Sequence, residues 1–354
     1  MALQFEPQVL SGSLQFTEVL NHRIHKGNLS GILAGEEVIL AGTEENVVIQ
    51  AGLCTVTLIP SLGGKISSIR VGTEELLQTP LKPLGPRTRT MSFSDGDASG
   101  WDECLPSVAA CQIQTEAGLA TIPDHGDLWR VPWQTLNSTA DSATLRAACF
   151  SLPLQLTRSV LVAESTHGWQ LQLLYSLTNM GAYRVPWVWC AHPLFAVDAG
   201  DAIDLPASVH TLRVEGSAGD RLGKNGDIAA WPIAVTRDRG EVDLRTVVVA
   251  NSGIGDKLFS NALDQGWCSI ERKRLGLRLT MRFEPSLTPY LGLWICDGGW
   301  PDGAGAKQVC VAPEPTTAPV DSLAIQDTWS RWLDPGETFT WPVELQIDRI
   351  AKTL

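Results

Sequence analysis

Four short stretches of this 354-residue sequence place ionisable side chains among aromatic or apolar neighbours. They are GWDECLPS (100–107), PDHGDLWRVPW (123–133), CAHPLF (190–195) and VCVAPEPTTAPVDS (309–322). The third contains His192 on an otherwise apolar strand, and the fourth contains Glu314 between two prolines where an apolar strand ends. A fixed carboxylate can accept a proton and a histidine can donate one, so this pair is suited to general acid–base chemistry.

Each of these residues also has a purely structural interpretation. His192 can be a buried histidine with both ring nitrogens hydrogen-bonded, and Glu314 can be a solvated loop acid. Asp102 and Glu103 can cap a turn, and His125 can form hydrogen bonds within its own loop. The residues alone leave these alternatives open.

Tryptophans flank the ionisable residues. Trp101 precedes the two acids, Trp129 follows His125 by four positions, and Trp189 lies just before CAHPLF. Sugar rings stack their C–H faces on indole while polar groups bind their hydroxyls. We therefore expect a carbohydrate site whose aromatic wall comes from Trp101, Trp129 or Trp189.

The elements that must position these residues show a period-two alternation of apolar and polar side chains, clearest over 169–179, 277–285 and 338–348. This is the period of half-buried strands in antiparallel sheets, and no stretch keeps a helical period over a dozen residues. The 32 glycines and 21 prolines fall mostly between the apolar runs, as turns require. We predict an all-β chain with two stacked antiparallel sheets. Residues 45–354 would form one β-sandwich domain, and residues 1–44 an N-terminal arm or edge strands.

The composition limits the classes of partner. The 39 acidic and 27 basic residues give a net charge of −12, which argues against nucleic acid or an anionic membrane as the partner. No apolar run reaches transmembrane length and the first residues lack the features of a signal peptide, so we expect a cytoplasmic protein. The eight cysteines show no metal-binding spacing, and we expect them to be reduced.

Taken in order along the chain, the stretches resemble the motifs of the galactose mutarotase superfamily, the aldose 1-epimerases and their relatives. The resemblance covers residues 45–348 and includes the last turn and strand at 333–345. The motifs are LGGKISSIRVGTEELL (62–77), GWDECLP (100–106), DHG (124–126), HPLF (192–195), DKLF (256–259) and PEPTTAPVDS (313–322). Six motifs in register imply a large antiparallel β-sandwich that acts on a small carbohydrate.

The resemblance implies that His192 is the general acid and Glu314 the general base, with His125 and Asp256 contacting the sugar's ring oxygen and hydroxyls. Opening a hemiacetal ring removes a proton from the C1 hydroxyl and gives one to the ring oxygen. Rotation about C1–C2 and the reverse transfers yield the other anomer. We expect the two catalytic groups on opposite sides of one sugar ring, with no metal and no organic cofactor.

The sequence departs from the family pattern at GWDECLP, where an arginine that contacts the sugar is usual. Asp102 and Glu103 stand there instead, and we predict both as substrate contacts. Leu194 replaces the tyrosine of the H-P-Y-F motif, and Lys65 adds a cation that we expect at the surface. These departures indicate a divergent subgroup and leave open whether its sugar is free, phosphorylated or otherwise derivatised.

Two other functions fit the same residues. The first is a non-catalytic carbohydrate-binding protein, although binding alone requires neither an acid nor a base. The second is a sugar lyase or glycoside hydrolase on the same fold, with Glu314 and either Asp102 or Glu103 as two acids about 5–10 Å apart. The sequence does not fix the oligomeric state.

Overall fold

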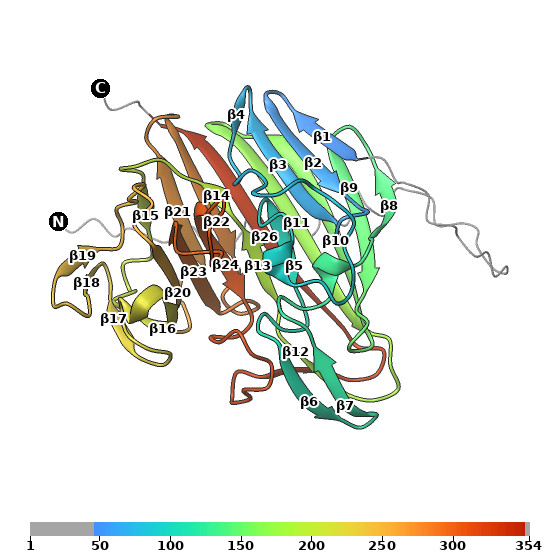
Figure 1. Ribbon diagram of the computed structural model, residues 1–354. Coiled ribbons are helices and arrows are strands. Elements are labelled where there is room, and N and C mark those ends of the chain that lie inside the picture. The colour runs from blue at the N-terminus through green and yellow to red at the C-terminus, as the bar shows by residue number, and fades with distance from the viewer. Residues whose placement is uncertain (1–45, 351–354) are drawn as a thin grey trace, which may run out of the picture. The chain divides into compact units, whose positions relative to one another are not determined.

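The computed structural model of the protein describes residues 46–350, and its regular structure is almost entirely β-strand (Figure 1). The helices of this part of the chain are three 3-10 turns, η1 (Phe93–Asp95), η2 (Leu128–Arg130) and η3 (Ala218–Asp220). The predicted all-β fold is confirmed. The arm or edge strands predicted for residues 1–44 lie outside the described residues.

Two large antiparallel sheets contain most of the strands. The twelve-stranded sheet contains β1 (Val47–Ala51), β2 (Cys54–Ile59), β3 (Lys65–Val71), β4 (Glu74–Glu75), β5 (Trp101–Cys104), β13 (Cys190–Pro193), β14 (Phe195–Ala196), β16 (Thr211–Ser217), β17 (Ile228–Ala230), β20 (Ile254–Phe259), β23 (Tyr290–Asp297) and β24 (Val309–Thr316). The eight-stranded sheet contains β8 (Gln134–Ser138), β9 (Ser142–Ala148), β10 (Leu154–Glu164), β11 (Gly168–Asn179), β15 (Ala202–Asp204), β21 (Trp267–Arg272), β22 (Leu277–Phe283) and β26 (Thr338–Arg349).

Three two-stranded sheets accompany them. They are β6 (Cys111–Thr115) with β7 (Gly118–Ile122), β12 (Val185–Trp187) with β25 (Arg331–Leu333), and β18 (Ile233–Val235) with β19 (Glu241–Asp243). The order of the twelve-stranded sheet is β1-β2-β3-β5-β13-β24-β23-β20-β16-β17, with β4 added to β3 and β14 added to β24. Strands distant in sequence therefore become neighbours at its centre, where β5, β13 and β24 lie side by side.

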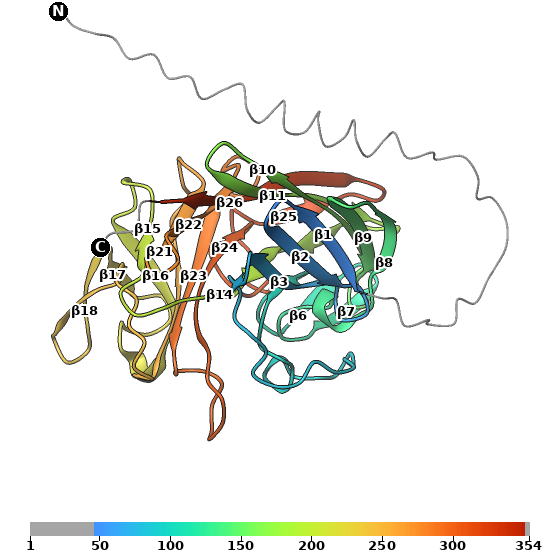
Figure 2. The same cartoon turned by 90° about the horizontal axis from the view of Figure 1, so that it is seen from above.

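The two large sheets form two layers (Figure 2), and their facing side chains form one apolar core. Val56 and Leu293 of the twelve-stranded sheet belong to this core together with Leu171 and Leu345 of the eight-stranded sheet. The predicted β-sandwich is confirmed, and burial of these side chains is its main source of stability.

The sequence alternation corresponds to burial in the eight-stranded sheet. On β11, Trp169, Leu171 and Leu173 are buried, whereas Gln170 and Gln172 are only partly covered. The registers of β11 with β26 and of β26 with β22 are regular, so the apolar positions of all three strands share one face. The interpretation of these segments as half-buried strands is confirmed.

The twelve-stranded sheet alternates in the same way, but both of its faces are covered at the centre. On β23 and β24, Leu293 and Val311 face the core, while the adjacent Trp294 and Ala312 pack in a separate small apolar cluster on the opposite, outer face. The side chains of β23 and β24 that do not belong to the core therefore lie on the outer face of the sheet.

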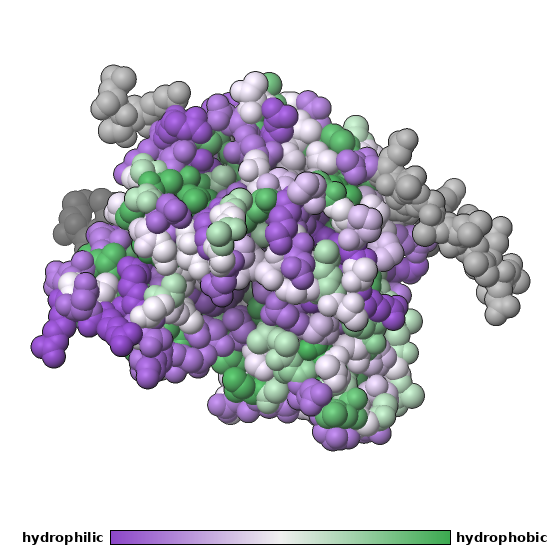
Figure 3. All heavy atoms as spheres, viewed as in Figure 1, coloured by the Kyte–Doolittle hydropathy of each residue, from purple (hydrophilic) through white to green (hydrophobic). Residues whose placement is uncertain are grey.

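No helix within residues 46–350 is long and apolar enough to cross a membrane. The surface drawn in Figure 3 mixes polar and apolar residues, with apolar ones gathered at the lower end of that view, where Figure 1 places β6 and β7. Leu119 of β7 is 63% exposed.

Leu171→Ala should lower the free energy of unfolding by about 2–5 kcal/mol, because it removes a fully buried side chain from the packed interface of the sheets. Gln172→Ala, on the opposite face of the same strand, should change it by less than about 0.5 kcal/mol. Chemical denaturation followed by circular dichroism checks both values. Equal losses in the two variants would contradict the assignment of faces.

Candidate active site

A cavity of about 200 Å³ lies on the outer face of the twelve-stranded sheet. Its lining comes from segments far apart in sequence: Phe93, Val108, Ala109, Asp124, His125, His192, Lys257, Trp294, Trp300, Gln308, Glu314 and Asp321. The structure thus brings together three of the four residues that the motif order was expected to gather, namely His125, His192 and Glu314.

His192 and Glu314 come from neighbouring strands, because β13 pairs with β24 through Cys190 and Thr316. Nε2 of His192 lies 3.9 Å from Oε1 of Glu314. A sugar ring does not fit between groups this close, so the expected placement on opposite sides of a ring is wrong. The pair instead suits two oxygens bonded to one carbon, such as the hydroxyl and ring oxygens at C1 of a hemiacetal.

The two oxygens of the Glu314 carboxylate have different surroundings. The Lys257 ammonium contacts Oε2, and the Cys190 thiol donates to the same oxygen over 3.3 Å. Oε1 is buried with no hydrogen-bond partner among the described residues. Gly292 lies opposite on β23, and a Cβ there would be 3.1 Å from Oε2. Glycine at this position therefore leaves room for the carboxylate, and Oε1 is the oxygen left free to react.

Asp321 is a second carboxylate beside the same ammonium, with Oδ1 3.6 Å from Nζ of Lys257. Burial alone would lower the pKa of Lys257, but the charges of Asp321 and Glu314 outweigh it and raise the pKa above its usual value. Burial raises the pKa of Asp321 to about 6, although the charge of Lys257 acts in the opposite direction. The Lys257 ammonium therefore lies beside two acidic side chains, and the pKa of one of them, Asp321, is close to neutrality.

The His192 imidazole is held in its neutral form. Burial lowers its pKa well below the usual range, and positive charge on His125, Lys257 and Lys65 lowers the pKa further. The side chain is 9% exposed, and Nδ1 has no hydrogen-bond partner among the described residues. His192 therefore does not fit the alternative of a core histidine with both nitrogens satisfied.

His125 lies in a tight turn at the cavity. Its φ is 58°, and that of Gly126 is 68°. A Cβ on Gly126 would lie 2.2 Å from the carbonyl oxygen of Leu105, which explains why glycine follows the histidine. The His125 ring stacks on Phe93, with centroids 3.8 Å apart and planes at 5°, and Nδ1 lies 2.9 Å from Oδ2 of Asp124.

Arg130 fixes this turn against the segment that carries Phe93. Its guanidinium donates to the carbonyl oxygens of Asp124 and Gly126 and, over 3.0 and 2.7 Å, to that of Met91. Arg130 is 5% exposed, so these hydrogen bonds are shielded from water. The stacking of Phe93 on His125 therefore rests on a buried link between two loops.

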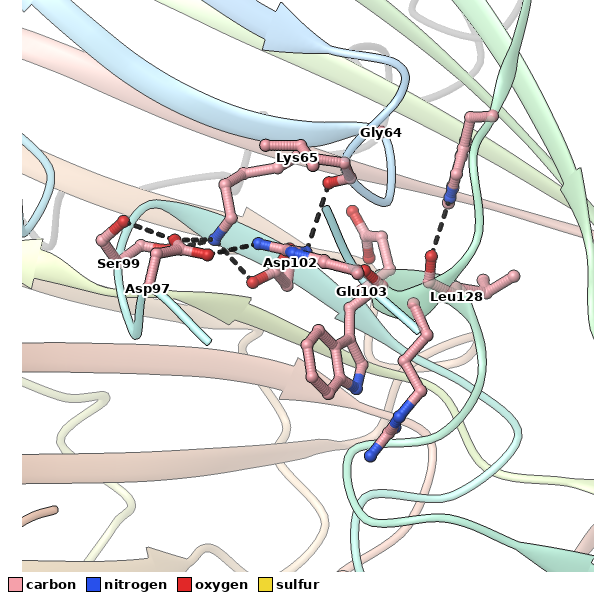
Figure 4. A network of polar contacts seen from close by, with 12 residues as sticks. Gly64, Lys65, Asp97, Ser99, Asp102, Glu103 and Leu128 are labelled. Atoms are coloured by element: carbon pink, nitrogen blue, oxygen red, sulfur yellow. Dashed lines mark hydrogen bonds and ion pairs between the residues drawn. The ribbon is translucent and has the colours of Figure 1, made fainter. Parts of the chain in front are cut away.

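Asp102 lies in a buried ion network next to the cavity. It is in register with His192 on β5, but it accepts hydrogen bonds from Lys65 over 2.6 Å and from Arg87 over 3.2 Å and does not line the cavity. Lys65 also pairs with Asp97 at 3.1 Å (Figure 4). Lys65 is fully buried, so the expected surface position is wrong.

Glu103, the next residue of β5, points to the opposite face. It is fully buried and accepts three hydrogen bonds, each of 2.9 Å, from Arg158, Tyr175 and Trp189. Arg158 and Tyr175 belong to the eight-stranded sheet, so Glu103 links the two sheets inside the core. This carboxylate does not line the cavity either.

Asp256 is on the other face of β20 from the cavity-lining Lys257, because adjacent residues of a strand alternate. Its carboxylate contacts the Arg221 guanidinium and accepts a 2.6 Å hydrogen bond from Ser217. The structure gives Asp256 a structural environment, and its role as a sugar contact stays a prediction.

The aromatic surface of the cavity comes from residues other than the three predicted tryptophans. Trp294 and Trp300 line it together with Phe93. Trp101 and Trp189 are fully buried in the core. Trp129 packs edge-on against Phe93 at 5.1 Å and so supports the wall from behind.

Sequence reasoning missed Lys257 and Asp321 although both lie inside quoted motifs, DKLF and PEPTTAPVDS. Adjacent residues of β20 point to opposite faces, so knowing that Asp256 faces away from the cavity would have identified Lys257 as a cavity residue. Trp294 and Trp300 carried no such signal. Within residues 46–350 no group of three or more His, Cys, Asp or Glu side chains is arranged to hold a metal ion.

No protein-family model matches the chain, and no curated protein matches it in sequence. Solved structures do match. Slr1438 from Synechocystis sp. PCC 6803 is 17% identical, with 88% of this chain and 100% of that one covered and a TM-score of 0.63. A galactose mutarotase-like protein from Lactobacillus casei ATCC 334 is 15% identical, with 86% and 100% covered and a TM-score of 0.61. The GalM/aldose epimerase homologue from C. elegans is 14% identical, with 87% and 99% covered and a TM-score of 0.57.

At these identities the likeness shows the fold. The chain has the galactose mutarotase-like fold, which confirms the resemblance found in the sequence. The residues of the cavity must be argued from their own geometry.

Wild-type protein should lose stability relative to His192→Asn as the pH falls below about 6.5. The pKa of His192 is lowered in the folded protein, so in this range the unfolded chain binds a proton that the folded protein does not. Each pH unit then costs the wild type up to about 1.4 kcal/mol that the variant does not lose. Denaturant unfolding of both proteins between about pH 5 and 8 measures this difference. A difference that stays constant with pH would contradict the buried neutral imidazole.

Proposed function

We propose that the protein interconverts the α and β anomers of a free sugar, as an aldose 1-epimerase-like enzyme. The observation that carries this proposal is the placement of His192 and Glu314, whose facing atoms lie 3.9 Å apart in the cavity. The fold supports it, since similar structures include a galactose mutarotase-like protein and an aldose epimerase homologue.

Glu314 accepts the proton of the C1 hydroxyl through Oε1 while the protonated form of His192, whose population grows as the pH falls, donates a proton to the ring oxygen. The bond between C1 and the ring oxygen breaks, its electron pair stays on that oxygen, and C1 becomes an aldehyde carbon. Rotation about C1–C2 presents the other face of the aldehyde, and the reverse transfers close the ring. A base and an acid held together suffice for this, because no electrons are gained or lost.

The lining favours a neutral sugar. Phe93, Trp294 and Trp300 supply apolar surface for a ring, and Gln308 supplies an amide. Among the described lining residues Lys257 is the one lysine or arginine, and it is already paired with two carboxylates. A phosphate would meet those carboxylates without a free cation to bind it.

The hydrolase alternative loses its predicted acid pair, because Asp102 and Glu103 are engaged in buried ion pairs and do not line the cavity. A hydrolase also needs one carboxyl group that keeps its proton. Of the carboxyl groups beside Lys257, Asp321 has its pKa raised to about 6, so a hydrolase would have to use Asp321 with Glu314 in place of the predicted acids. The binding-protein alternative differs from the enzyme in one observable, the rate of anomer exchange.

Glu314→Gln and His192→Asn should each slow anomer exchange by about 10²–10⁴-fold, the usual worth of a positioned proton-transfer group. Sugar affinity should change much less, because the amides keep hydrogen-bonding capacity and similar volume. NMR exchange spectroscopy with D-glucose and D-galactose measures the rates, and titration of the same samples measures affinity.

Asp256→Asn is the matched control, since it removes a carboxylate from the same sheet on the other face. An exchange rate per folded molecule near that of the wild type would assign Asp256 a structural role only. A loss as large as that of Glu314→Gln would instead support the predicted contact of Asp256 with the sugar.

The alkaline limb of kcat/KM should lie below about pH 6.5, because this limb reports loss of the proton from the acid in the free enzyme and the pKa of His192 is lowered. Exchange rates with D-galactose at subsaturating concentration, from about pH 4.5 to 8, give this profile. A limb at pH 7 or above would contradict His192 as the acid.

A further inference from the structure

Lys257 is the cavity residue that the acid–base mechanism does not yet use. It lies on β20, opposite Trp294 of β23, and its side chain is 11% exposed. Its ammonium contacts Oε2 of Glu314 and lies 3.6 Å from Oδ1 of Asp321. Two carboxylates attract the ammonium from different sides, so the lysine side chain keeps one orientation.

The contact with Lys257 gives the two oxygens of the Glu314 carboxylate different surroundings. Oε2 receives both the ammonium and the thiol of Cys190, whereas Oε1, the oxygen nearer His192, receives no hydrogen bond from the described residues. A carboxylate that rotated freely would present either oxygen to a substrate. With Oε2 held, only Oε1 is available beside the imidazole.

The ammonium also compensates a buried negative charge. Glu314 is fully buried, and a carboxylate without a neighbouring cation in such a place takes up a proton more readily. Asp321 is the other group on the same ammonium. Neither of the other cations near His192, on Lys65 and His125, contacts Glu314: Lys65 pairs with Asp97 and Asp102, and His125 with Asp124.

We propose that Lys257 is the positioning residue of the site: it holds Oε2 of Glu314, directs Oε1 toward the sugar's C1 hydroxyl, and stabilises the charged form of the base. The inference rests on the proposed anomerase function, but the placement of the Lys257 charge beside His192 can be tested without activity. Lys257 acts through Glu314 and does not itself exchange a proton with the sugar.

Lys257→Met keeps the length of the side chain and removes its charge. The plateau exchange rate should fall by about 10²-fold, with a smaller change in KM, since a poorly oriented and protonated base affects proton transfer more than binding. The alkaline limb of the pH profile should move to higher pH, because Lys257 no longer lowers the pKa of His192. Lys257→Arg should recover most of the rate.

Lys65→Met is the matched control, because Lys65 is also buried and paired with carboxylates but does not contact Glu314. It should lower stability while its plateau rate per folded molecule stays within a few-fold of the wild type. Its shift of the alkaline limb should be smaller than that of Lys257→Met, because Lys65 lowers the pKa of His192 less than Lys257 does.

Imidazole NMR titration gives a readout independent of turnover, with the His192 signal assigned from His192→Asn. The charged and titratable groups that face Lys257 or His192 are Glu314, Asp321, Cys190, His125 and Lys65. Lys257→Met should raise the pKa of His192, whether or not the wild type turns over a sugar. If the methionine variant does not fold, Lys257→Gln replaces it in both measurements.

The outcomes separate the two claims. A wild type that leaves the anomers of D-glucose, D-galactose and their 6-phosphates at the spontaneous rate would overturn the proposed function, while an altered His192 titration would still support the placement of Lys257. An active wild type whose Lys257→Met variant keeps its rate and its alkaline limb would overturn the positioning role alone.

Discussion

Successive residues of β5, β20 and β24 point to opposite faces of the twelve-stranded sheet, and this alternation separates the core from the site. On β24 it sends Val311 into the core and Glu314 to the outer face. On β20 it turns Lys257 to the cavity and Asp256 away from it. A slip of one residue in the pairing of β20 or β24 would turn the core residues outward and the cavity residues inward. The strand register that builds the core therefore also fixes the site.

Buried charges surround this arrangement, and most of them are paired. Glu103 is satisfied by three donors between the sheets, and Lys65 joins Asp97 and Asp102 beside the cavity. A buried ion without partners is costly, so these networks limit how the central strands can move. Two buried atoms without hydrogen-bond partners, Oε1 of Glu314 and Nδ1 of His192, belong to the pair assigned to proton transfer.

The sequence was informative where chemistry and periodicity agreed. Alternation along 169–179 predicted β11 and its buried face, and motif order brought out His125, His192 and Glu314. It failed where a carboxylate or a cation is neutralised by residues distant in the chain. Asp102, Glu103 and Lys65 have partners up to 86 positions away in sequence, and no local pattern reveals such pairs. The tryptophans that line the cavity could not be distinguished from core tryptophans either, because that difference also depends on residues distant in the chain.

The central claim is that a neighbouring imidazole and carboxylate catalyse ring opening at C1. The most direct measurement is two-dimensional NMR exchange between the anomeric protons of D-galactose and of D-glucose, with and without wild-type protein, at a pH near 6 where spontaneous exchange is slow. The account predicts cross-peaks that grow with protein concentration for at least one of the two sugars. A protein that binds one of these sugars, shown by shifts of its own resonances, yet leaves the exchange at the spontaneous rate would contradict it.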